Sequence, residues 1–182
     1  MIKVIGICGK AGSGKTTVAN YLVNKYKVGK ISFATPIRKM LYPVIENLYI
    51  DRSDQEIEDV LYKNKGKEID ALGTSPRKLM QDIGALMRDY NEDVFVNLAQ
   101  KTLEGVEELN EVLGRIVAEG IFQVRSSTYV IDDLRYDNEA RWIKDSGGLI
   151  FRLNRPEDQL RKVPKHHSVN GVSDEYVDHE FH

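Results

Sequence analysis

The residues from Gly9 to Thr16 read GKAGSGKT and place a lysine and a hydroxyl side chain directly after a run rich in glycine. They match the pattern G-x-x-x-x-G-K-[ST] at every fixed position. Glycines let backbone N–H groups turn inward around phosphate oxygens, and a helix that begins at Lys15 would add the positive end of its dipole. The lysine can reach the β- and γ-phosphates, and the Thr16 hydroxyl can ligate Mg²⁺. The sequence therefore predicts a site for a nucleoside triphosphate with Mg²⁺.

The motif also lies where such a loop must lie, between an apolar strand (Ile2 to Cys8) and a helical pattern (Lys15 to Tyr26). The alternative interpretation is an ordinary glycine turn before a helix, and it leaves the complete motif unexplained. The residues that we expect around the triphosphate are Gly9, Ala11, Gly12, Ser13, Gly14, Lys15, Thr16 and Thr17.

A second group of polar residues lies at the end of the apolar run that begins at Thr128 and closes in Asp132 and Asp133. Sites with this loop hold Mg²⁺ or its waters with an acid at the end of a neighbouring strand. Because side chains alternate along a strand, Asp133 and Arg135 are predicted to point to one side and Asp132 to the other. We expect Asp133 to serve the metal, directly or through water, and Arg135 to serve phosphate, so that Lys15, Asp133 and Arg135 are the candidate catalytic residues. The alternative is that the aspartates cap the next helix, which is the favoured interpretation for Asp132.

A third candidate is the helix predicted to begin at Ser75-Pro76, with serine as N-cap. Arg77, Gln81 and Arg88 fall on one stripe with Gly84, and arginine suits bidentate recognition of phosphate. The alternative is an ordinary solvated face. The apolar side of this helix is predicted to consist of Leu79, Met80, Ile83, Leu86 and Met87. Arg38, near the start of an earlier helix, is a further candidate for an anionic ligand.

The elements that must position these residues alternate between strand and helix. Such alternation predicts an α/β fold with a mainly parallel sheet, whose ligands sit at the carboxyl ends of the strands. The expected strands are Ile2–Cys8, Lys30–Ala34, Thr128–Asp133, Leu149–Leu153 and Val177–Phe181. The expected helices are Lys15–Tyr26, one opening at Pro36, Ser53–Tyr62 with a capping box, one opening at Ser75-Pro76, Asp93–Glu119 with glycines that could break it, and Asn138–Asp145.

The composition limits the class of protein. The chain has 182 residues, which suits one compact domain with room for an inserted lobe. Its 26 basic and 28 acidic residues give a net charge of −2, so a nucleic-acid polymer is not an expected partner. The single cysteine, Cys8, excludes an internal disulfide framework and favours a reducing, cytoplasmic location. No apolar run approaches the ~20 residues of a membrane span, and we expect no secretory signal and no membrane partner.

The segment from Asn154 to Gly171 is basic and resembles a loop, and residues 154–176 are expected to form a lid-like segment over the phosphates. Its cationic side chains include Arg155 and Arg161. Its histidines have no carboxylate or cysteine at the spacing of a metal site, so zinc is not expected.

Five stretches, in this order, carry a resemblance to a known family: GKAGSGKTTVANYL, FATPIRKM, SPRKLMQDIGALMR, VIDDLRYDNEARWI and GGLIFRLNR. Across most of residues 1–155 the chain resembles the bacteriophage deoxynucleoside monophosphate kinases, a branch of the P-loop nucleoside monophosphate kinases. The resemblance implies a three-layer α/β/α domain spanning 1–182 with a five-stranded core, a helical monophosphate-binding lobe at 36–100, and a lid. It also implies a possible homodimer and, for a phage gene, the cytoplasm of the host bacterium. Phe95 stands where the family usually has tryptophan.

Carried over by position, the resemblance assigns Lys15 and Thr16 to the ATP phosphates and Mg²⁺, and Asp133 to the strand-end acid. It assigns Arg77, Gln81, Arg88 and Arg135 to the monophosphate, and Arg155 and Arg161 to the lid over ATP. The implied reaction moves the γ-phosphate of ATP to a deoxynucleoside monophosphate. A kinase that phosphorylates an alcohol group of another small metabolite, and a regulatory NTPase or nucleotide-binding module without an acceptor, are the alternatives.

Overall fold

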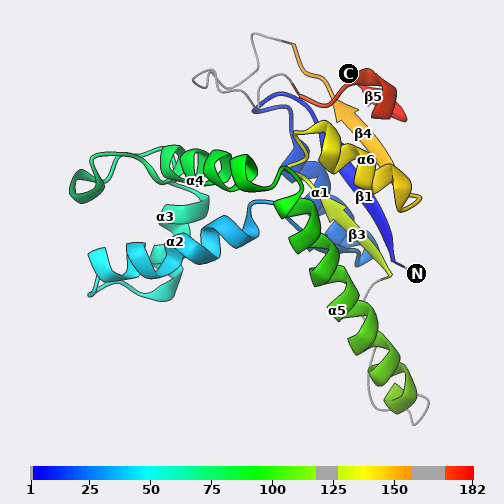
Figure 1. Cartoon of the computed structure of the whole chain (residues 1–182), viewed down its shortest axis with the longest axis horizontal. Coiled ribbons are helices and arrows are strands. Elements are labelled where there is room, and N and C mark those ends of the chain that lie inside the picture. The colour runs from blue at the N-terminus through cyan, green and yellow to red at the C-terminus, as the bar shows by residue number, and fades with distance from the viewer. Residues whose placement is uncertain (1, 118–126, 157–170) are drawn as a thin grey trace. The chain divides into compact units, whose positions relative to one another are not determined.

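Five parallel strands form one sheet in the order β2-β3-β1-β4-β5 (Figure 1). The computed structural model describes residues 2–117, 127–156 and 171–182, and for residues 111–117 it describes the backbone alone. The strands are β1 (Lys3–Cys8), β2 (Gly29–Ile31), β3 (Thr128–Ile131), β4 (Leu149–Leu153) and β5 (His179–Phe181). The predicted α/β fold, with a parallel five-stranded sheet and helices on both of its faces, is confirmed.

The helices lie close to their predicted positions. They are α1 (Lys15–Tyr26), α2 (Thr35–Leu48), α3 (Asp54–Tyr62), α4 (Pro76–Tyr90), α5 (Val94–Val117) and α6 (Asp137–Asp145), with short 3₁₀ turns η1 (Asp70–Leu72) and η4 (Asp174–Tyr176). The expected capping box of α3 is present, and the Ser75 hydroxyl accepts a hydrogen bond from the Lys78 N–H at 3.3 Å at the start of α4. Gly105 does not break α5, which is one continuous helix. Among the described residues, no helix is both long and apolar enough to cross a membrane.

Two strands end earlier than predicted. The second strand was expected to reach Ala34 but ends at Ile31, and the third was expected to reach Asp133 but ends at Ile131. Both neighbours of β3 stop pairing at the same level, because Ile131 is the last partner of Gly6 in β1 and of Ile31 in β2. The polar residues after Ile131 therefore belong to a loop and not to the strand.

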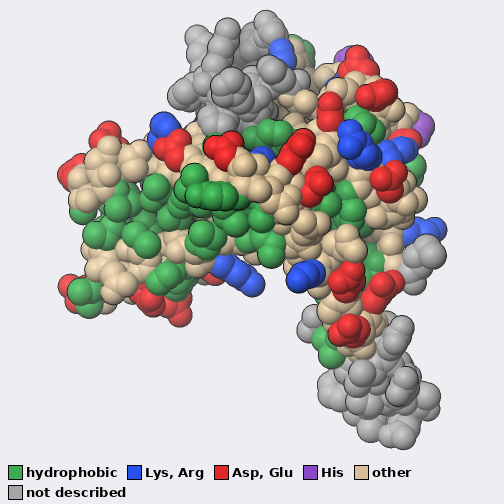
Figure 2. Space-filling view, viewed as in Figure 1, with side chains coloured by type: hydrophobic (Ala, Val, Ile, Leu, Met, Phe, Trp, Pro, Cys, Tyr) green, Lys and Arg blue, Asp and Glu red, His purple; other side chains and the backbone are tan. Residues whose placement is uncertain are grey.

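The chain divides into two compact units, which are described separately. The first contains residues 1–33 and 96–182 and holds the sheet; the second, residues 34–95, is helical. The second unit packs α2, α3 and α4 around a core of its own, whose buried side chains include Ile37, Leu41, Ile45, Ile57, Leu61 and Met80. It overlaps the lobe predicted at 36–100, whose ligand-binding role stays a prediction. On the face drawn in Figure 2, apolar side chains gather over this helical unit.

The central strand β1 is buried on both faces, as its unbroken apolar run predicts. Ile7 packs with Ala19 of α1, Val130 and Leu153 on one face. Gly6 turns to the other face, where a built Cβ would lie 2.8 Å from a Leu134 methyl and 2.9 Å from an Ile143 methyl. The missing side chain of Gly6 thus makes room for α6 and for the loop that leads into it.

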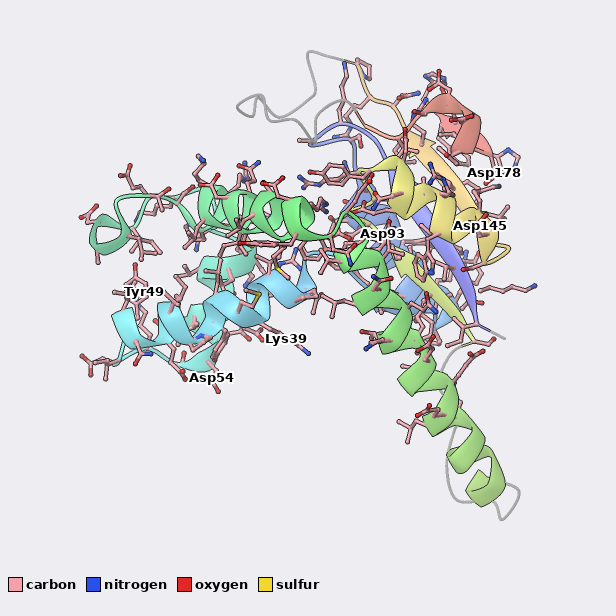
Figure 3. The ribbon with its side chains drawn as sticks, viewed as in Figure 1. Lys39, Tyr49, Asp54, Asp93, Asp145 and Asp178 are labelled. Atoms are coloured by element: carbon pink, nitrogen blue, oxygen red, sulfur yellow. The ribbon has the colours of Figure 1, made fainter. Side chains whose placement is uncertain are left out.

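The last segment of the chain is held against β4 and α6 by charged side chains. Asp178 accepts a hydrogen bond from the Ile150 N–H at 2.7 Å and pairs with Lys144 of α6 (Figure 3). Arg152 pairs with Asp174 and Glu180, and Asp137 accepts hydrogen bonds from the N–H and hydroxyl of Ser173 at 2.8 and 2.6 Å. These contacts fix where the chain returns at residue 171, although residues 157–170 of the expected lid lie outside the described residues.

The start of β4 provides a test of the packing. A Cβ at Gly148 would lie 2.5 Å from the Val4 carbonyl oxygen and 2.8 Å from the Ile143 carbonyl oxygen, and backbone atoms cannot move aside cheaply. We expect Gly148→Ala to lower the free energy of unfolding by about 1–3 kcal/mol or more. At Gly105, inside α5, an added Cβ meets nothing within 4 Å, so Gly105→Ala should raise stability by about 0.5–1 kcal/mol. Urea unfolding of both variants is the measurement, and equal stabilities would contradict the close approach of β1 and β4.

Candidate nucleotide-binding site

The turn after β1 is shaped by glycines with positive φ. Gly9, Gly12 and Gly14 have φ values of 133°, 87° and 96°, a region that side chains with a Cβ rarely adopt. A Cβ at Gly9 would also lie 2.3 Å from the Leu153 carbonyl oxygen, so the loop passes directly against the end of β4. The predicted loop thus stands between β1 and α1, and the N-terminus of α1 opens into it.

The ammonium group of Lys15 closes this loop on itself. Its Nζ donates hydrogen bonds to the carbonyl oxygens of Gly9 at 2.6 Å and Lys10 at 2.7 Å. Burial and, after it, the positive charge of Arg135 lower the pKa of Lys15 from 10.5 to about 8, against the opposing influence of Cys8 and Asp132. An anion bound in the loop would raise the pKa of Lys15 again, because its negative charge stabilises the half-buried ammonium and offsets the charge of Arg135.

Ser13 shows that the loop is suited to a phosphate ligand. The residue is 7% exposed, and its buried hydroxyl oxygen has no hydrogen-bond partner among the residues that the structure describes. A buried hydroxyl is normally hydrogen-bonded, and a polar group left alone in this way marks a place where a ligand or water completes the bonding. The unsatisfied hydroxyl, the positive-φ glycines and the cationic Lys15 together fit a polyphosphate.

The two aspartates after β3 have different partners. Asp132 pairs with Lys30 at 2.9 Å and is not the cap of α6, so the capping interpretation for Asp132 is wrong. The carboxylate of Asp133 accepts a hydrogen bond from the Ser32 hydroxyl at 2.6 Å and from the Phe33 N–H at 3.1 Å. The strand ends at Ile131, so the alternation of side chains between the two faces of a strand does not extend to Asp133 and Arg135. The prediction that these two side chains point to the same side therefore cannot be based on strand geometry.

Glu139 was not among the predicted site residues, although it supports the loop that carries Arg135. Its side chain is 1% exposed, and one carboxylate oxygen, Oε2, accepts hydrogen bonds from the N–H groups of Arg135 at 2.9 Å and Tyr136 at 3.2 Å. An acid in the first turn of a helix is a recognisable capping signal. It was not recognised in the sequence because Tyr136 replaces the usual Ser, Thr, Asp or Asn at the N-cap.

The remaining predicted residues of the triphosphate site lie around the loop. Arg155, just after β4, donates a hydrogen bond from its guanidinium to the Gly12 carbonyl at 3.2 Å. Thr16 and Thr17 are exposed in the first turn of α1. Arg161 falls outside the described residues. Within the described part of the chain, no group of three or more His, Cys, Asp or Glu side chains could hold a metal ion, so the pairing of Thr16 with Asp133 around Mg²⁺ stays a prediction.

Within the helical unit, the predicted stripe of α4 does not form a solvated face. Arg77, Gln81 and Arg88 are half-buried and Gly84 is buried, whereas Leu86, placed on the predicted apolar side, is 56% exposed. The stripe is packed because Gly84 brings α4 close to α2: a Cβ there would lie 3.2 Å from an Ile37 methyl. The interpretation as an ordinary solvated face is therefore wrong for α4.

The arginines of this unit are held by aromatic rings and backbone. The guanidinium of Arg88 lies over the ring of Phe95 at 4.5 Å, and that of Arg38 lies over the ring of Tyr62 at 4.6 Å. Phe95 is 2% exposed, and its correspondence to a tryptophan of the family stays a prediction. Stacking on a ring restricts a guanidinium and prepares its planar fork of N–H donors for bidentate contact with an anion such as phosphate.

A five-stranded parallel sheet with helices on both faces and a glycine-rich loop after its central strand defines the class of fold, an α/β fold consistent with that of P-loop kinases. No protein-family model matches the chain. A curated protein of Acanthamoeba polyphaga mimivirus, named "Putative deoxynucleotide monophosphate kinase", is 30% identical over 154 residues, which cover 84% of this chain and 74% of the viral protein. The chain belongs to this family of nucleotide kinases. A bacteriophage origin stays a prediction.

The pKa of Lys15 leads to a prediction about binding. The ammonium is favoured by a bound polyphosphate, so its pKa should rise on binding from its value of about 8 in the free protein. We expect nucleoside triphosphate binding to take up a proton above pH 8 and to weaken as the pH rises, by up to about tenfold per unit. Calorimetric titrations in buffers of different ionisation enthalpy measure this uptake. Lys15→Met should abolish it, and proton release by the unaltered protein would contradict the assignment.

Glu139 leads to a second prediction. Glu139→Ala removes the acceptor of two N–H groups and should lower the free energy of unfolding by about 1.5–3 kcal/mol and weaken triphosphate binding. Glu139→Gln keeps one oxygen that can accept both bonds, because both N–H groups donate to the same Oε2. The glutamine variant should therefore retain most of the stability and affinity. Urea unfolding and binding titrations compare the two variants, and equal losses would show that the negative charge matters and the hydrogen bonds do not.

Proposed function

We propose that the protein transfers the γ-phosphoryl group of ATP to the phosphate of a deoxynucleoside monophosphate, which gives the diphosphate and ADP. The observation that carries the proposal is the glycine-rich loop with its half-buried Lys15 and unsatisfied Ser13 hydroxyl, in a chain of the deoxynucleotide monophosphate kinase family. The name of the mimiviral relative supports the same substrate class.

The donor side of the proposed reaction rests on residues of the first unit. The N–H groups of Gly9 to Thr16 and the Lys15 ammonium would bind the β- and γ-phosphates. Thr16 and Asp133 are the residues that would hold Mg²⁺, directly or through water. When bound, Mg²⁺ supplies charge neutralisation on the phosphates. Arg155, which already contacts the Gly12 carbonyl, would turn to the phosphates from the β4 side, and Arg161 would join it.

Chemistry favours a phosphate as the acceptor. A phosphate monoester is largely dianionic near neutral pH because its second pKa is about 6, so it attacks without a general base. What it requires is cationic side chains that offset its charge and align it for in-line attack. Asp133, the one acid placed for a base, already accepts hydrogen bonds from Ser32 and Phe33, which fits an orienting role better than proton removal. An alcohol acceptor would need such a base.

On the acceptor side we propose that Arg77, Gln81 and Arg88 of α4 bind the monophosphate, with Arg38 of α2 and with Arg135 from the loop after β3. Support comes from the packed stripe of α4 and from the rings under Arg38 and Arg88, which hold both guanidinium groups in defined orientations. Arg135 would link the two sides, since its charge already acts on Lys15.

The decisive experiment measures ADP release with Mg-ATP and each of the four deoxynucleoside monophosphates, with several alcohols and with water alone. At least one monophosphate should raise turnover by an order of magnitude or more over water, and Lys15→Ala should abolish that increase. Stimulation by an alcohol instead would indicate a metabolite kinase. Turnover that is the same with every acceptor would leave an NTPase, and either result would refute the proposal.

The same assay tests the acceptor side with a matched pair of variants. Arg77→Ala should raise the KM for the monophosphate by about tenfold or more and leave that for ATP within about twofold, because one charged contact to phosphate is lost. Lys78→Ala removes the neighbouring, exposed cation, which pairs with Asp82, and should change neither constant. Equal losses for both substrates would refute the role of Arg77.

A further inference from the structure

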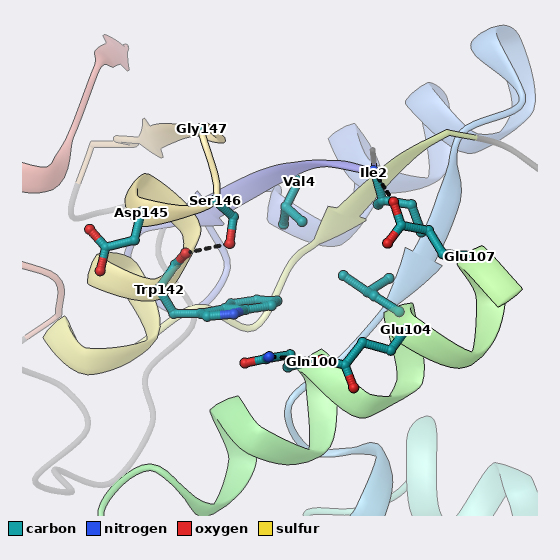
Figure 4. A pocket seen from close by; sticks show the side chains of 10 residues that line it. Ile2, Val4, Gln100, Glu104, Glu107, Trp142, Asp145, Ser146 and Gly147 are labelled. Atoms are coloured by element: carbon teal, nitrogen blue, oxygen red, sulfur yellow. Dashed lines mark hydrogen bonds between the residues drawn. The ribbon is translucent and has the colours of Figure 1, made fainter.

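A second pocket lies in the first unit, at the amino end of β1 and away from the phosphate loop (Figure 4). It has a volume of about 640 Å³ and lies between Ile2 and Val4 of the sheet, α5, and the end of α6. The stretch of β1 from Val4 to Gly9 corresponds to roughly 16 Å of extended chain. A nucleotide whose phosphates occupy the loop therefore leaves this pocket free, and the proposed function does not use it.

The pocket has an apolar floor and one aromatic wall. Val4 and Leu103 are 2% and 7% exposed and form the floor, and the half-buried indole of Trp142 projects into the space beside them (Figure 4). The indole also contacts the ring of Phe33, with centroids 6.0 Å apart and an interplanar angle of 71°. Such an edge-to-face contact stabilises the position of the indole that forms the wall.

The polar side chains of the pocket are acidic. Glu104 and Glu107 of α5 face the indole across the pocket, whereas the carboxylate of Asp145 points away from it at the outer edge (Figure 4). Glu107 accepts a hydrogen bond from the Ile2 N–H at 2.9 Å, and Glu104 accepts one from the Gln100 amide at 2.8 Å. No lysine or arginine is among the ten residues that line the pocket. Glu104 and Asp145 form no ion pair with any residue that the structure describes.

We propose that this pocket binds an organic cation, an ammonium or guanidinium group carried on a flat apolar body. The indole face attracts a cation through its quadrupole, the carboxylates offset its charge, and the apolar floor covers its body. An anion is repelled by both glutamates, and a neutral aromatic molecule gains nothing from them. A bare metal ion is disfavoured because no group of three metal-ligating side chains exists among the described residues.

Trp142 makes the proposal directly testable, because it is the only tryptophan in the chain. Its fluorescence, and its single indole N–H resonance in isotopically labelled protein, both report on this pocket. The full-length protein is titrated with three ligands of similar shape: 2-phenylethylammonium, 2-phenylethanol and 3-phenylpropanoate. Potassium chloride at matched ionic strength controls for salt. We expect a saturable change with the cation, binding weaker by about tenfold or more for the alcohol, and none for the carboxylate.

Paired variants locate the binding. The double variant Glu104→Gln/Glu107→Gln keeps side-chain shape and the acceptor for Ile2, and should weaken binding of the cation by about tenfold or more. Glu108→Gln, an exposed position on the same helix outside the pocket, is the control and should change nothing. Equal affinities for cation and alcohol, an unchanged indole signal at millimolar cation, or equal behaviour of the double variant and the unaltered protein would each overturn the proposal. None of these readouts depends on kinase activity.

Discussion

The contact of Gly9 with the end of β4 is the constraint on which the site depends. β1 is the middle strand of the sheet, and its chain must reverse into α1 within six residues while passing directly against the Leu153 carbonyl. Only glycine meets both the positive φ and the lack of space at this position. Because the strands are parallel, their carboxyl ends meet at one edge, and the loop therefore lies between the segment after β3 and the segment after β4. Arg135 and Arg155 come from these two segments.

The charges around the loop show what the arrangement is prepared for. The Lys15 ammonium donates hydrogen bonds to two carbonyl oxygens, which offset only part of its positive charge. Its pKa is lowered because the charged form is incompletely stabilised. Asp132 offsets only part of this charge, since it also pairs with Lys30, and Asp133 accepts hydrogen bonds from Ser32 and Phe33. The loop therefore carries an excess of positive charge, and the nearby aspartates already have other partners. Such a site attracts a polyanion such as a nucleotide. The buried Ser13 hydroxyl points to the same need for an acceptor.

Local signals in the sequence predicted most of the fold, whereas the roles of the candidate site residues stay predictions. The glycine-rich turn after β1, the order of strands and helices, and the caps of α3 and α4 arise from short-range patterns, and the structure contains them. The extrapolation of β3 to Asp133 failed. Leu134 is 2% exposed and packs where Gly6, more than a hundred residues earlier, leaves space, so the chain leaves the strand pattern before Asp133. The pattern of apolar residues around Leu134 does not predict this contact, because it depends on a residue far away in the sequence. The packed stripe of α4 was hidden for the same reason, because it depends on the space at Gly84 beside Ile37.

The chain as a whole is nearly neutral, with a net charge of −2, but this figure conceals a separation of charge along the sheet. Lys15, Arg135 and Arg155 lie at the carboxyl end of the central strands, and the acidic pocket with Glu104 and Glu107 lies at the amino end. A parallel sheet keeps its two edges apart by the length of its strands, so ligands of opposite charge can be held on one domain without competing. A short chain of contacts joins the two ends of the sheet. The Trp142 indole, which lines the acidic pocket, contacts the ring of Phe33, and the Phe33 N–H donates a hydrogen bond to Asp133 at 3.1 Å. The acidic pocket is therefore connected through Phe33 to the acid that follows β3.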